Sequence, residues 1–213
     1  MNITGRPSKN ALFDAVEKAL RPLDGFVGID AASASFKNRK MFRTDAYYGI
    51  DIDLDALKAG LEEQEKNRYG IHADLARLHA LPQNSVDVIV STYTLYHMSP
   101  QNRLAALSHF CRITAPTGHL IFELPLTDDF DRAVTLVQEQ FTCVDVLYFK
   151  NAFSRWYVSF FEREDGGVHP CLFKLPFRMI AWAIGKCEWF TRRYRSWNMH
   201  GLVFCSQKKE QGE

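Results

Sequence analysis

The feature that most constrains this fold is the alternation of short apolar runs with amphipathic segments. Runs such as 26–30 (FVGID) and 85–92 (SVDVIVST) suit buried strands, whereas segments such as 99–114 carry apolar residues at helical spacing. Parallel strands need crossover connections, which helices usually supply. The alternation therefore predicts an α/β fold, a doubly wound and mostly parallel sheet with helices on both faces.

The predicted elements follow this rhythm up to residue 149. The expected strands are 26–30, 46–52, 69–74, 85–92, 119–125, 142–149 and 200–208, and the expected helices are 8–20, 53–68, 99–114 and 128–141. Residues 115–118 (APTG) are expected to form a turn. Because 142–149 and 200–208 lack the α/β rhythm, we expect the last strand of this seven-stranded sheet to be antiparallel at its edge.

The length of 213 residues suits one large domain. We predict a single domain over 1–213, in which the aromatic and basic stretch 151–199 is a helical insertion or lid. The formal net charge of +1 argues against a nucleic-acid partner. The five cysteines are scattered without a CxxC pair, which favours free thiols in a reducing compartment. With no apolar signal-peptide core near the N-terminus, we expect a cytoplasmic protein. The oligomeric state is not predicted.

Acidic residues follow three successive predicted strands. Asp30 ends the first, Asp51 the second and Asp74 the third, while the fourth runs into 91–97 (STYTLYH). In an open α/β sheet, ligands bind outside the carboxyl ends of the strands, where the strand order reverses. A carboxylate at the second strand can accept hydrogen bonds from a ribose diol, and one at the third suits an exocyclic amine such as that of adenine.

This order of motifs resembles the class I S-adenosylmethionine-dependent methyltransferase family, of the methyltransferase type 11 kind, over about residues 25–125. The segments that carry the resemblance are IDAASAS (29–35), YYGIDID (47–53), HADLARLHALPQNSVDVIVSTYTLYHM (72–98) and ITAPTGHLIFELP (113–125). SFKNRKMFRTDAYYGIDI (35–52) looks like a family variant in which an aromatic and basic stretch replaces the first helix.

The resemblance implies S-adenosyl-L-methionine as cofactor and a Rossmann-like methyltransferase fold. The loop after the first strand would meet the methionyl end, Asp51 the ribose, and Asp74 with Leu75 the adenine. The cofactor-binding residues implied are Asp30, Ala32, Ser33, Ala34, Asp51, Ile52, Asp74, Leu75 and Ser91, and the catalytic candidates are Tyr93 and His97. No metal is expected. Methyl transfer depends mainly on alignment, so no catalytic triad is expected either.

The loop departs from the family pattern because it contains no glycine. Ala32 and Ala34 stand where glycines are expected, and Phe36 stands near a third. Alanine is tolerated where φ is negative and is costly where φ must be positive. Ser33 and Ser35 could donate hydroxyl hydrogen bonds to a cofactor carboxylate. The alternative is a non-catalytic methyltransferase-like binding domain. A nicotinamide-dependent oxidoreductase is a third hypothesis, weakened by the absence of GxGxxG.

Some of these candidate residues also have structural interpretations. Asp51 could be a helix N-terminal acid, although Asp53 suits that role better. His97 is either a general base or substrate contact, or a residue that packs the start of the next helix. A metal site from His72, Asp74 and His79 is supported by neither spacing nor a partner.

The stretch 170–197 is dense in apolar residues, and the part between Cys171 and His200 holds six Lys or Arg against one Glu. One interpretation is a lid or a peripheral membrane contact through 171–195 that serves a lipid-like methyl acceptor. The other is a helical insertion with a solvated basic rim. Arg192, Arg193 and Arg195 could bind an anionic substrate or simply be solvated. The acceptor is expected to be a small or lipid-like molecule.

Overall fold

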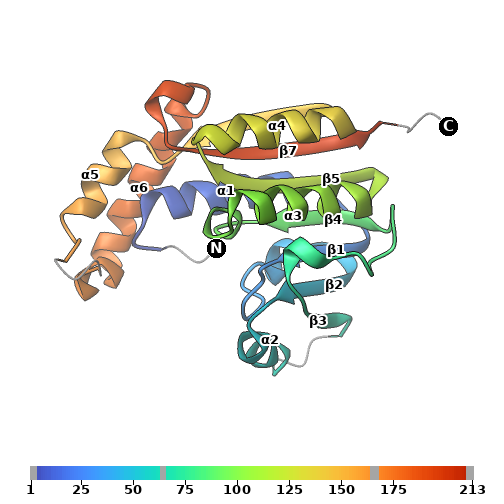
Figure 1. Ribbon diagram of the computed structural model, residues 1–213. Helices are drawn as coiled ribbons and strands as arrows, with labels where there is room; N and C mark the ends of the chain where they lie inside the picture. Colours follow the sequence, from blue (N-terminus) through green and yellow to red (C-terminus); the bar gives the residue numbers. More distant parts are fainter. Residues whose placement is uncertain (1–3, 63–65, 164–167, 210–213) are drawn as a thin grey trace. The chain divides into compact units, whose positions relative to one another are not determined.

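The computed structural model describes residues 4–62, 66–163 and 168–209 (Figure 1). Its strands are β1 (Gly25–Ala31), β2 (Thr44–Asp51), β3 (Arg68–His72), β4 (Val86–Ser91), β5 (Thr114–Pro125), β6 (Phe141–Phe149) and β7 (His200–Lys208). Its α-helices are α1 (Pro7–Leu20), α2 (Leu54–Leu61), α3 (Pro100–Ile113), α4 (Asp128–Gln140), α5 (Ala152–Ser159) and α6 (Leu175–Thr191).

The seven strands form one sheet in the order β3-β2-β1-β4-β5-β7-β6, which confirms the predicted Rossmann-like architecture. The pairs β1–β2, β2–β3, β1–β4 and β4–β5 are parallel, and the C-terminal strands are antiparallel. The prediction that the last strand lies at the edge is wrong, because β7 lies between β5 and β6 and the edge strand is β6. From β1 the chain first builds outward through β2 and β3, then resumes on the other side with β4. The strand order therefore reverses between β1 and β4, where an α/β sheet places its ligand site.

The central strands are apolar because both of their faces are covered. Ile29 of β1, Ile89 of β4 and Leu120 of β5 are paired in register and buried. Burial on both faces produces the continuous apolar runs seen in the sequence, in place of strict alternation. The hydrophobic core of this sheet fixes the strand ends relative to one another, and those ends carry the candidate site.

Two predicted boundaries are wrong. The helix predicted over 53–68 ends at Leu61, and Arg68 already belongs to β3; residues 63–65 of that prediction lie outside the described residues. Asn67 takes φ 58°, a left-handed conformation that a helix does not accommodate, directly before the strand. The turn predicted over 115–118 lies inside β5, whose register against β4 shifts between Val86 and Val88.

The first crossover has no α-helix. Between β1 and β2 the structure has turns and one 3₁₀-helix, Arg39–Met41. The short aromatic and basic connection expected from the sequence is therefore present. The loop after β1 must turn back within a few residues to reach the sheet, so its backbone is tightly constrained.

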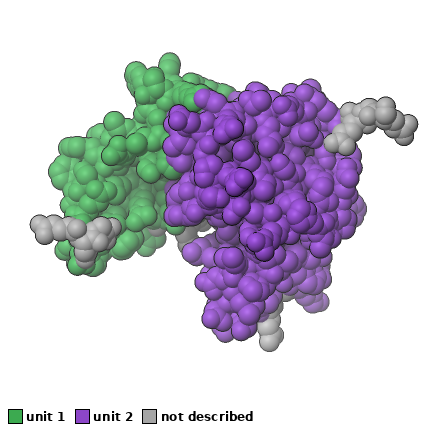
Figure 2. Space-filling view, in the orientation of Figure 1, with its two compact units in different colours: residues 1–18, 146–202 green, residues 19–145, 203–213 purple. Residues whose placement is uncertain are grey.

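The chain forms two compact units (Figure 2). One contains Met1–Lys18 and Val146–Leu202, and the other contains Ala19–Asp145 and Val203–Glu213. The stretch 151–199 lies in the first unit and contains α5 and α6. The N–H of Met199 donates to the carbonyl of Phe149 at 3.2 Å, so both ends of this stretch are held together. In the described ranges, no helix has the length and apolarity needed to cross a bilayer.

Candidate functional site

The predicted site residues that follow β1, β2 and β4 meet at one edge of the sheet. Ala31 pairs with Ile50 on one side and with Ser91 on the other. Asp51 pairs with His72, and its carbonyl accepts a hydrogen bond from the N–H of Ala73 at 3.0 Å. The parallel register therefore places the loop after β1, Asp51, the start of the Asp74 turn and Ser91 at the same carboxyl edge.

The loop after β1 has a left-handed backbone at alternate residues. The φ values are 61° for Ala32, 47° for Ala34 and 60° for Phe36. Ala32 and Ala34 stand where the family resemblance implies glycine, and Phe36 stands near a third such position. A residue with a Cβ in this conformation costs on the order of 1–3 kcal/mol and persists where the surrounding structure enforces it. The chain thus keeps the backbone path of a glycine loop without the glycines.

Hydrogen bonds and packing hold this path. The N–H groups of Ala32 and Ser33 both donate to the carbonyl of Ile50, at 2.7 and 3.1 Å. The Phe36 ring is buried and packs edge-to-face on Tyr47, with ring centroids 5.4 Å apart. A Cβ at Gly49 of β2 would collide with this ring, so the loop's bulky residue is accommodated by a glycine in the neighbouring strand.

Asp51 links the loop to the second strand. Its Oδ2 accepts from the N–H of Ala34 at 2.8 Å, and its Oδ1 accepts from the N–H of Asp53 at 2.9 Å. Each carboxylate oxygen has two lone pairs, so both can accept a further hydrogen bond. Asp53, as expected, caps α2 by accepting from the N–H groups of Asp55 and Ala56. The helix-capping alternative therefore belongs to Asp53, and Asp51 has capacity for a diol.

Asp30 is buried beneath the loop, with no exposed surface. Its carboxylate accepts from the Tyr47 hydroxyl at 2.7 Å and from the Asn38 side-chain amide at 3.0 Å. Burial raises the pKa of Asp30 to about 6, against the lowering effect of these two donors. A ligand cannot reach a carboxylate with this burial unless the loop opens. In this geometry Asp30 positions the loop, and its expected direct contact with a cofactor stays a prediction.

The edge also carries residues suited to an aromatic base. Asp74 caps the 3₁₀-helix Leu75–Arg77 by accepting from the N–H of Ala76 at 2.9 Å. Leu75 is buried, whereas Ile52, directly after Asp51, has 71% of its surface exposed. Ile52 is thus an exposed apolar side chain next to Asp51, whose carboxylate can accept further hydrogen bonds. This pair suits a ligand that is polar on one side and flat and apolar on the other.

Two buried hydroxyls test whether the edge fits a cofactor. The Oγ atoms of Ser33 and Ser91 are buried and have no hydrogen-bond partner within the part of the chain that the structure describes. Buried polar groups are nearly always satisfied, so an unpartnered one requires an explanation such as a ligand or a water molecule. Both belong to the predicted site. Together with Asp51 and Ile52 they fit a polar ligand that has an aromatic base.

The segment after β4 is held in a defined shape. Tyr93 takes φ 57°, and its N–H donates at 2.9 Å to Oε2 of Glu123, a fully buried acid in β5. Arg103 of α3 donates to the carbonyls of Leu95 and Met98 and pairs with Asp129 at 2.8 Å. These contacts fix the turn on both sides of His97.

His97 itself is exposed, and its ring packs on Tyr96 with centroids 4.1 Å apart. His72 and His79 are engaged elsewhere: a ring nitrogen of His72 lies 2.9 Å from the carbonyl oxygen of Ile52, and His79 packs on His109. Across the described ranges, no three His, Cys, Asp or Glu side chains gather as a metal site would require.

Comparison with protein families gives a match at this edge. Residues 27–122 match the family model described as a methyltransferase domain. The matched segment, just under half of the chain, is a methyltransferase domain. It spans β1 to β5 and contains every predicted site residue, from Asp30 to His97. No curated protein matches the sequence significantly.

Solved structures share the fold of this methyltransferase domain. The N-methyltransferase NodS from Bradyrhizobium japonicum WM9, in complex with S-adenosyl-L-homocysteine, is 15% identical with a TM-score of 0.57, covering 68% of this chain and 80% of NodS. YcgJ from Bacillus subtilis is 10% identical with a TM-score of 0.61, covering 94% and 98%. Phosphoethanolamine N-methyltransferase 2 from Haemonchus contortus, in complex with phosphomonomethylethanolamine and S-adenosylhomocysteine, is 17% identical with a TM-score of 0.55, covering 94% and 52%.

Sequence reasoning missed several residues that shape the methyltransferase domain. Tyr47 and Asn38 hold Asp30, Glu123 holds the turn at Tyr93, and Arg103 holds the turn at His97. Only Glu123 leaves a signal in the sequence, because an acid inside the apolar run HLIFELP is unusual for a buried strand. The other three lie in segments where polar residues are ordinary.

Proposed function

We propose that this chain transfers a methyl group from S-adenosyl-L-methionine to a small, apolar or lipid-like acceptor. One observation carries the proposal: the loop after β1 keeps left-handed backbone at Ala32, Ala34 and Phe36 although none of them is glycine. Left-handed backbone at residues other than glycine is found preferentially at ligand sites, where the surrounding structure enforces it. An abandoned site would be free to relax to a less strained loop.

Different residues of the carboxyl edge are assigned to the different parts of the cofactor. Asp51 would accept hydrogen bonds from the ribose hydroxyls, Ile52 and Leu75 would contact the adenine, and Asp74 would accept a hydrogen bond from the adenine amine. Ser33 and Ser91 supply hydroxyls at the loop and at β4. Ala32 and Ala34 let the backbone approach the methionyl part, while Asp30 holds the loop from beneath.

S-adenosyl-L-methionine supplies a methyl group already activated by its sulfonium charge, so alignment provides most of the catalysis. The protein then has to hold the acceptor in line and exclude water. Tyr93 and His97 lie on the turn that Arg103 and Glu123 fix. An exposed imidazole at His97 can accept a proton from an acceptor that must lose one, which gives this residue a general-base role.

The surface of the first unit supports a lipid-like acceptor and a peripheral membrane contact. Within 171–195 the large exposed apolar residues are Phe173, Leu175, Met179, Ile180, Trp189, Phe190 and Tyr194. They alternate with the basic residues Lys174, Arg178, Lys186, Arg192, Arg193 and Arg195. Exposed aromatics beside cations are the composition of surfaces that bind at an anionic membrane interface.

Calorimetric titration of the full chain with S-adenosylmethionine and S-adenosylhomocysteine tests the cofactor. We expect micromolar binding that is lost in Asp51→Ala and kept in Asp55→Asn. Asp55 is a matched control because it is an exposed acid four residues away that pairs with Lys58. Thermal unfolding of both variants checks that the fold is intact.

The rival function is a non-catalytic methyltransferase-like domain. If the folded protein gives no heat and no thermal shift with either ligand at millimolar concentration, the enzyme proposal is overturned and the binding domain is selected. If both variants lose binding equally, Asp51 has no special role and the assignment of the ribose site is wrong.

A further inference from the structure

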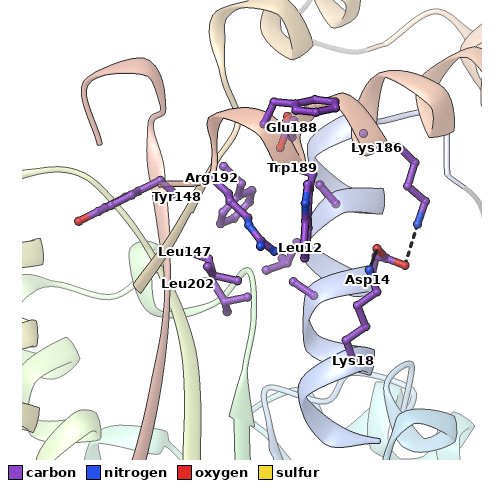
Figure 3. Close-up of a pocket in the computed structure, with 15 residues that line it drawn as sticks. Leu12, Asp14, Lys18, Leu147, Tyr148, Lys186, Glu188, Trp189, Arg192 and Leu202 are labelled. Carbon is purple, nitrogen blue, oxygen red and sulfur yellow. Dashed lines mark ion pairs between the residues drawn. The ribbon is translucent and has the colours of Figure 1, made fainter. Parts of the chain in front are cut away.

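The first unit contains a pocket, and the residues that line it in the described part of the chain all belong to that unit. The pocket has a volume of about 370 Å³ and lies between α1, the end of β6, α6 and the start of β7 (Figure 3). A volume of this size accommodates a small-molecule ligand. The aromatic residues Tyr148, Phe149, Trp189 and Phe190 line it, together with the aliphatic residues Leu12 and Leu202.

The walls of this pocket are fixed from two sides. At Gly185, α6 approaches the start of α1 so closely that an added Cβ would lie 2.7 Å from the carbonyl oxygen of Pro7. After α6, the carbonyl of Arg192 accepts from the N–H of Tyr148 in β6 at 2.8 Å. Because these contacts hold α6 to both α1 and β6, the space between the three elements is part of the folded structure.

Asp14 neutralises the lysines of the pocket. Its carboxylate pairs with Lys186 at 2.9 Å and with Lys18 at 3.1 Å, and Figure 3 shows it lying between these two side chains. Partial burial alone would raise the pKa of Asp14, but hydrogen bonds from the two lysines bring it below its usual value, so it is ionised. The lysine charges are therefore matched within the wall.

The other charged lining residues are engaged as well. Glu188 is buried and accepts from the Ser8 hydroxyl and from the N–H of Lys150, both at 3.0 Å. The Arg192 guanidinium lies over the ring of Trp189. A charged ligand would have to displace one of these contacts to find a partner of its own.

We propose that this pocket binds a small, neutral aromatic compound of a few fused rings. Aromatic walls favour an aromatic ligand, because rings gain from edge-to-face and offset contacts in addition to the burial of apolar surface. A compact, rigid ligand cannot leave a charged group in water while its rings are buried, so a charge on it would be desolvated without a partner. The proposal is independent of the cofactor, since no residue of the carboxyl edge lines the pocket.

The test is equilibrium dialysis of the full chain, without cofactor, against naphthalene and two charged relatives, naphthoate and naphthylmethylammonium. The three share one ring system and differ in charge. We expect naphthalene to bind roughly tenfold more tightly than either ion, because each ion loses hydration that the pocket does not replace. Ala15→Trp fills the pocket from α1 and should abolish binding of naphthalene, with thermal unfolding as the check that this variant folds.

A second variant tests the charge argument without changing the volume of the pocket. Asp14→Asn leaves Lys18 and Lys186 without their carboxylate, so naphthoate should bind about threefold or more tightly than it binds the original chain. Glu17→Gln removes the same charge from a residue of α1 that does not line the pocket, and should change naphthoate binding by less than about twofold.

Four outcomes overturn the proposal. Naphthalene does not bind the original chain, either ion binds it as tightly as naphthalene does, a folded Ala15→Trp variant binds naphthalene as well as the original, or Asp14→Asn and Glu17→Gln affect naphthoate equally. Because no cofactor is added, these outcomes do not depend on whether the chain binds S-adenosylmethionine.

Discussion

The N–H of Ala34 donates to Oδ2 of Asp51 at 2.8 Å, so the loop after β1 is tied to the carboxylate that is proposed to hold the ribose. Ligand binding at Asp51 is therefore coupled to the conformation of the loop after β1. A ligand that bonds to Asp51 fixes one end of this hydrogen bond, and a loop already in place lowers the entropy lost on binding. Cofactor affinity and loop conformation should change together in variants of either residue.

The left-handed backbone at Ala32 and Ala34 predicts that substitution by glycine does not destabilise the protein at these two positions. Ala32→Gly and Ala34→Gly should leave the free energy of unfolding unchanged or raise it by about 1 kcal/mol, because relief of strain offsets the extra freedom of the unfolded chain. Ala59→Gly, on the exposed part of α2, is the control and should lose about 1 kcal/mol. Urea unfolding measures all three. Equal losses would contradict the left-handed assignment.

The contact between Phe36 and Gly49 predicts a coupled pair. Gly49→Ala should destabilise the protein by about 1–3 kcal/mol through overpacking, and Phe36→Ala by about 3–5 kcal/mol through a cavity. In the double variant the added methyl group enters space that the ring has left. The double loss should therefore be smaller than the sum of the single losses. An additive result in urea unfolding would show that the two residues are not in contact.

The buried carboxyl of Asp30 predicts a pH dependence of stability. Its pKa is about 6 in the folded protein and 3.8 in the unfolded chain. Between these values the folded state binds more protons, so the free energy of unfolding falls as pH rises, by roughly 3 kcal/mol in total. Below pH 3.8 both states are protonated and the contribution is fully present.

Asp30→Asn removes this contribution, since the amide does not titrate. Relative to the original chain, the variant should gain stability as pH rises from about 4 to 7, measured by urea unfolding at a series of pH values. Asp45→Asn, an exposed acid of β2, serves as the control and should show no such gain. A difference that stays flat with pH would rule out the raised pKa.

The ion pair of Arg103 and Asp129 predicts an effect on the turn at His97. Arg103→Lys keeps the charge but cannot reach both carbonyls and Asp129 together, because it lacks the planar fork. We expect a loss of stability of about 2–3 kcal/mol. In assays with an acceptor, the KM for that acceptor should rise more than the KM for the cofactor. Equal changes in both would mean that the turn does not contact the acceptor.

The exposed face of the first unit predicts binding to anionic vesicles. Sedimentation with vesicles containing phosphatidylserine should recover the protein, with less recovery at high salt and little with phosphatidylcholine alone. Leu175→Ser should weaken binding, whereas Phe26→Ser, an equally exposed apolar residue of β1, should not. Equal recovery of both variants, or no recovery of the original chain, would remove the membrane contact from the proposal.

The sequence was sufficient for the mostly parallel α/β sheet and for the edge that carries the site, because apolar runs indicate the strands and Asp30, Asp51 and Asp74 lie at or just beyond the ends of β1, β2 and β3. It did not predict that β7 lies between β5 and β6, since apolar runs do not determine strand order. It could not predict that Asp30 is held by Tyr47, seventeen residues away, since that contact depends on the register of β1 and β2. Nor could it assign positive φ to Phe36, because a bulky residue there is disfavoured unless Gly49 makes room. The two helices α5 and α6 were not predicted separately, as the apolar residues of 151–199 are too dense to form a clear stripe.

The hydrogen bond between Met199 and Phe149 closes the stretch 150–199 at its base. β6 and β7 are neighbours in the sheet, so a short hairpin turn could join them directly. The stretch with α5 and α6 is thus topologically an enlarged hairpin loop, and its sequence can change without altering strand order. If this stretch binds the acceptor or a membrane surface, as proposed, that specificity can change without any change to the strands that carry the carboxyl edge.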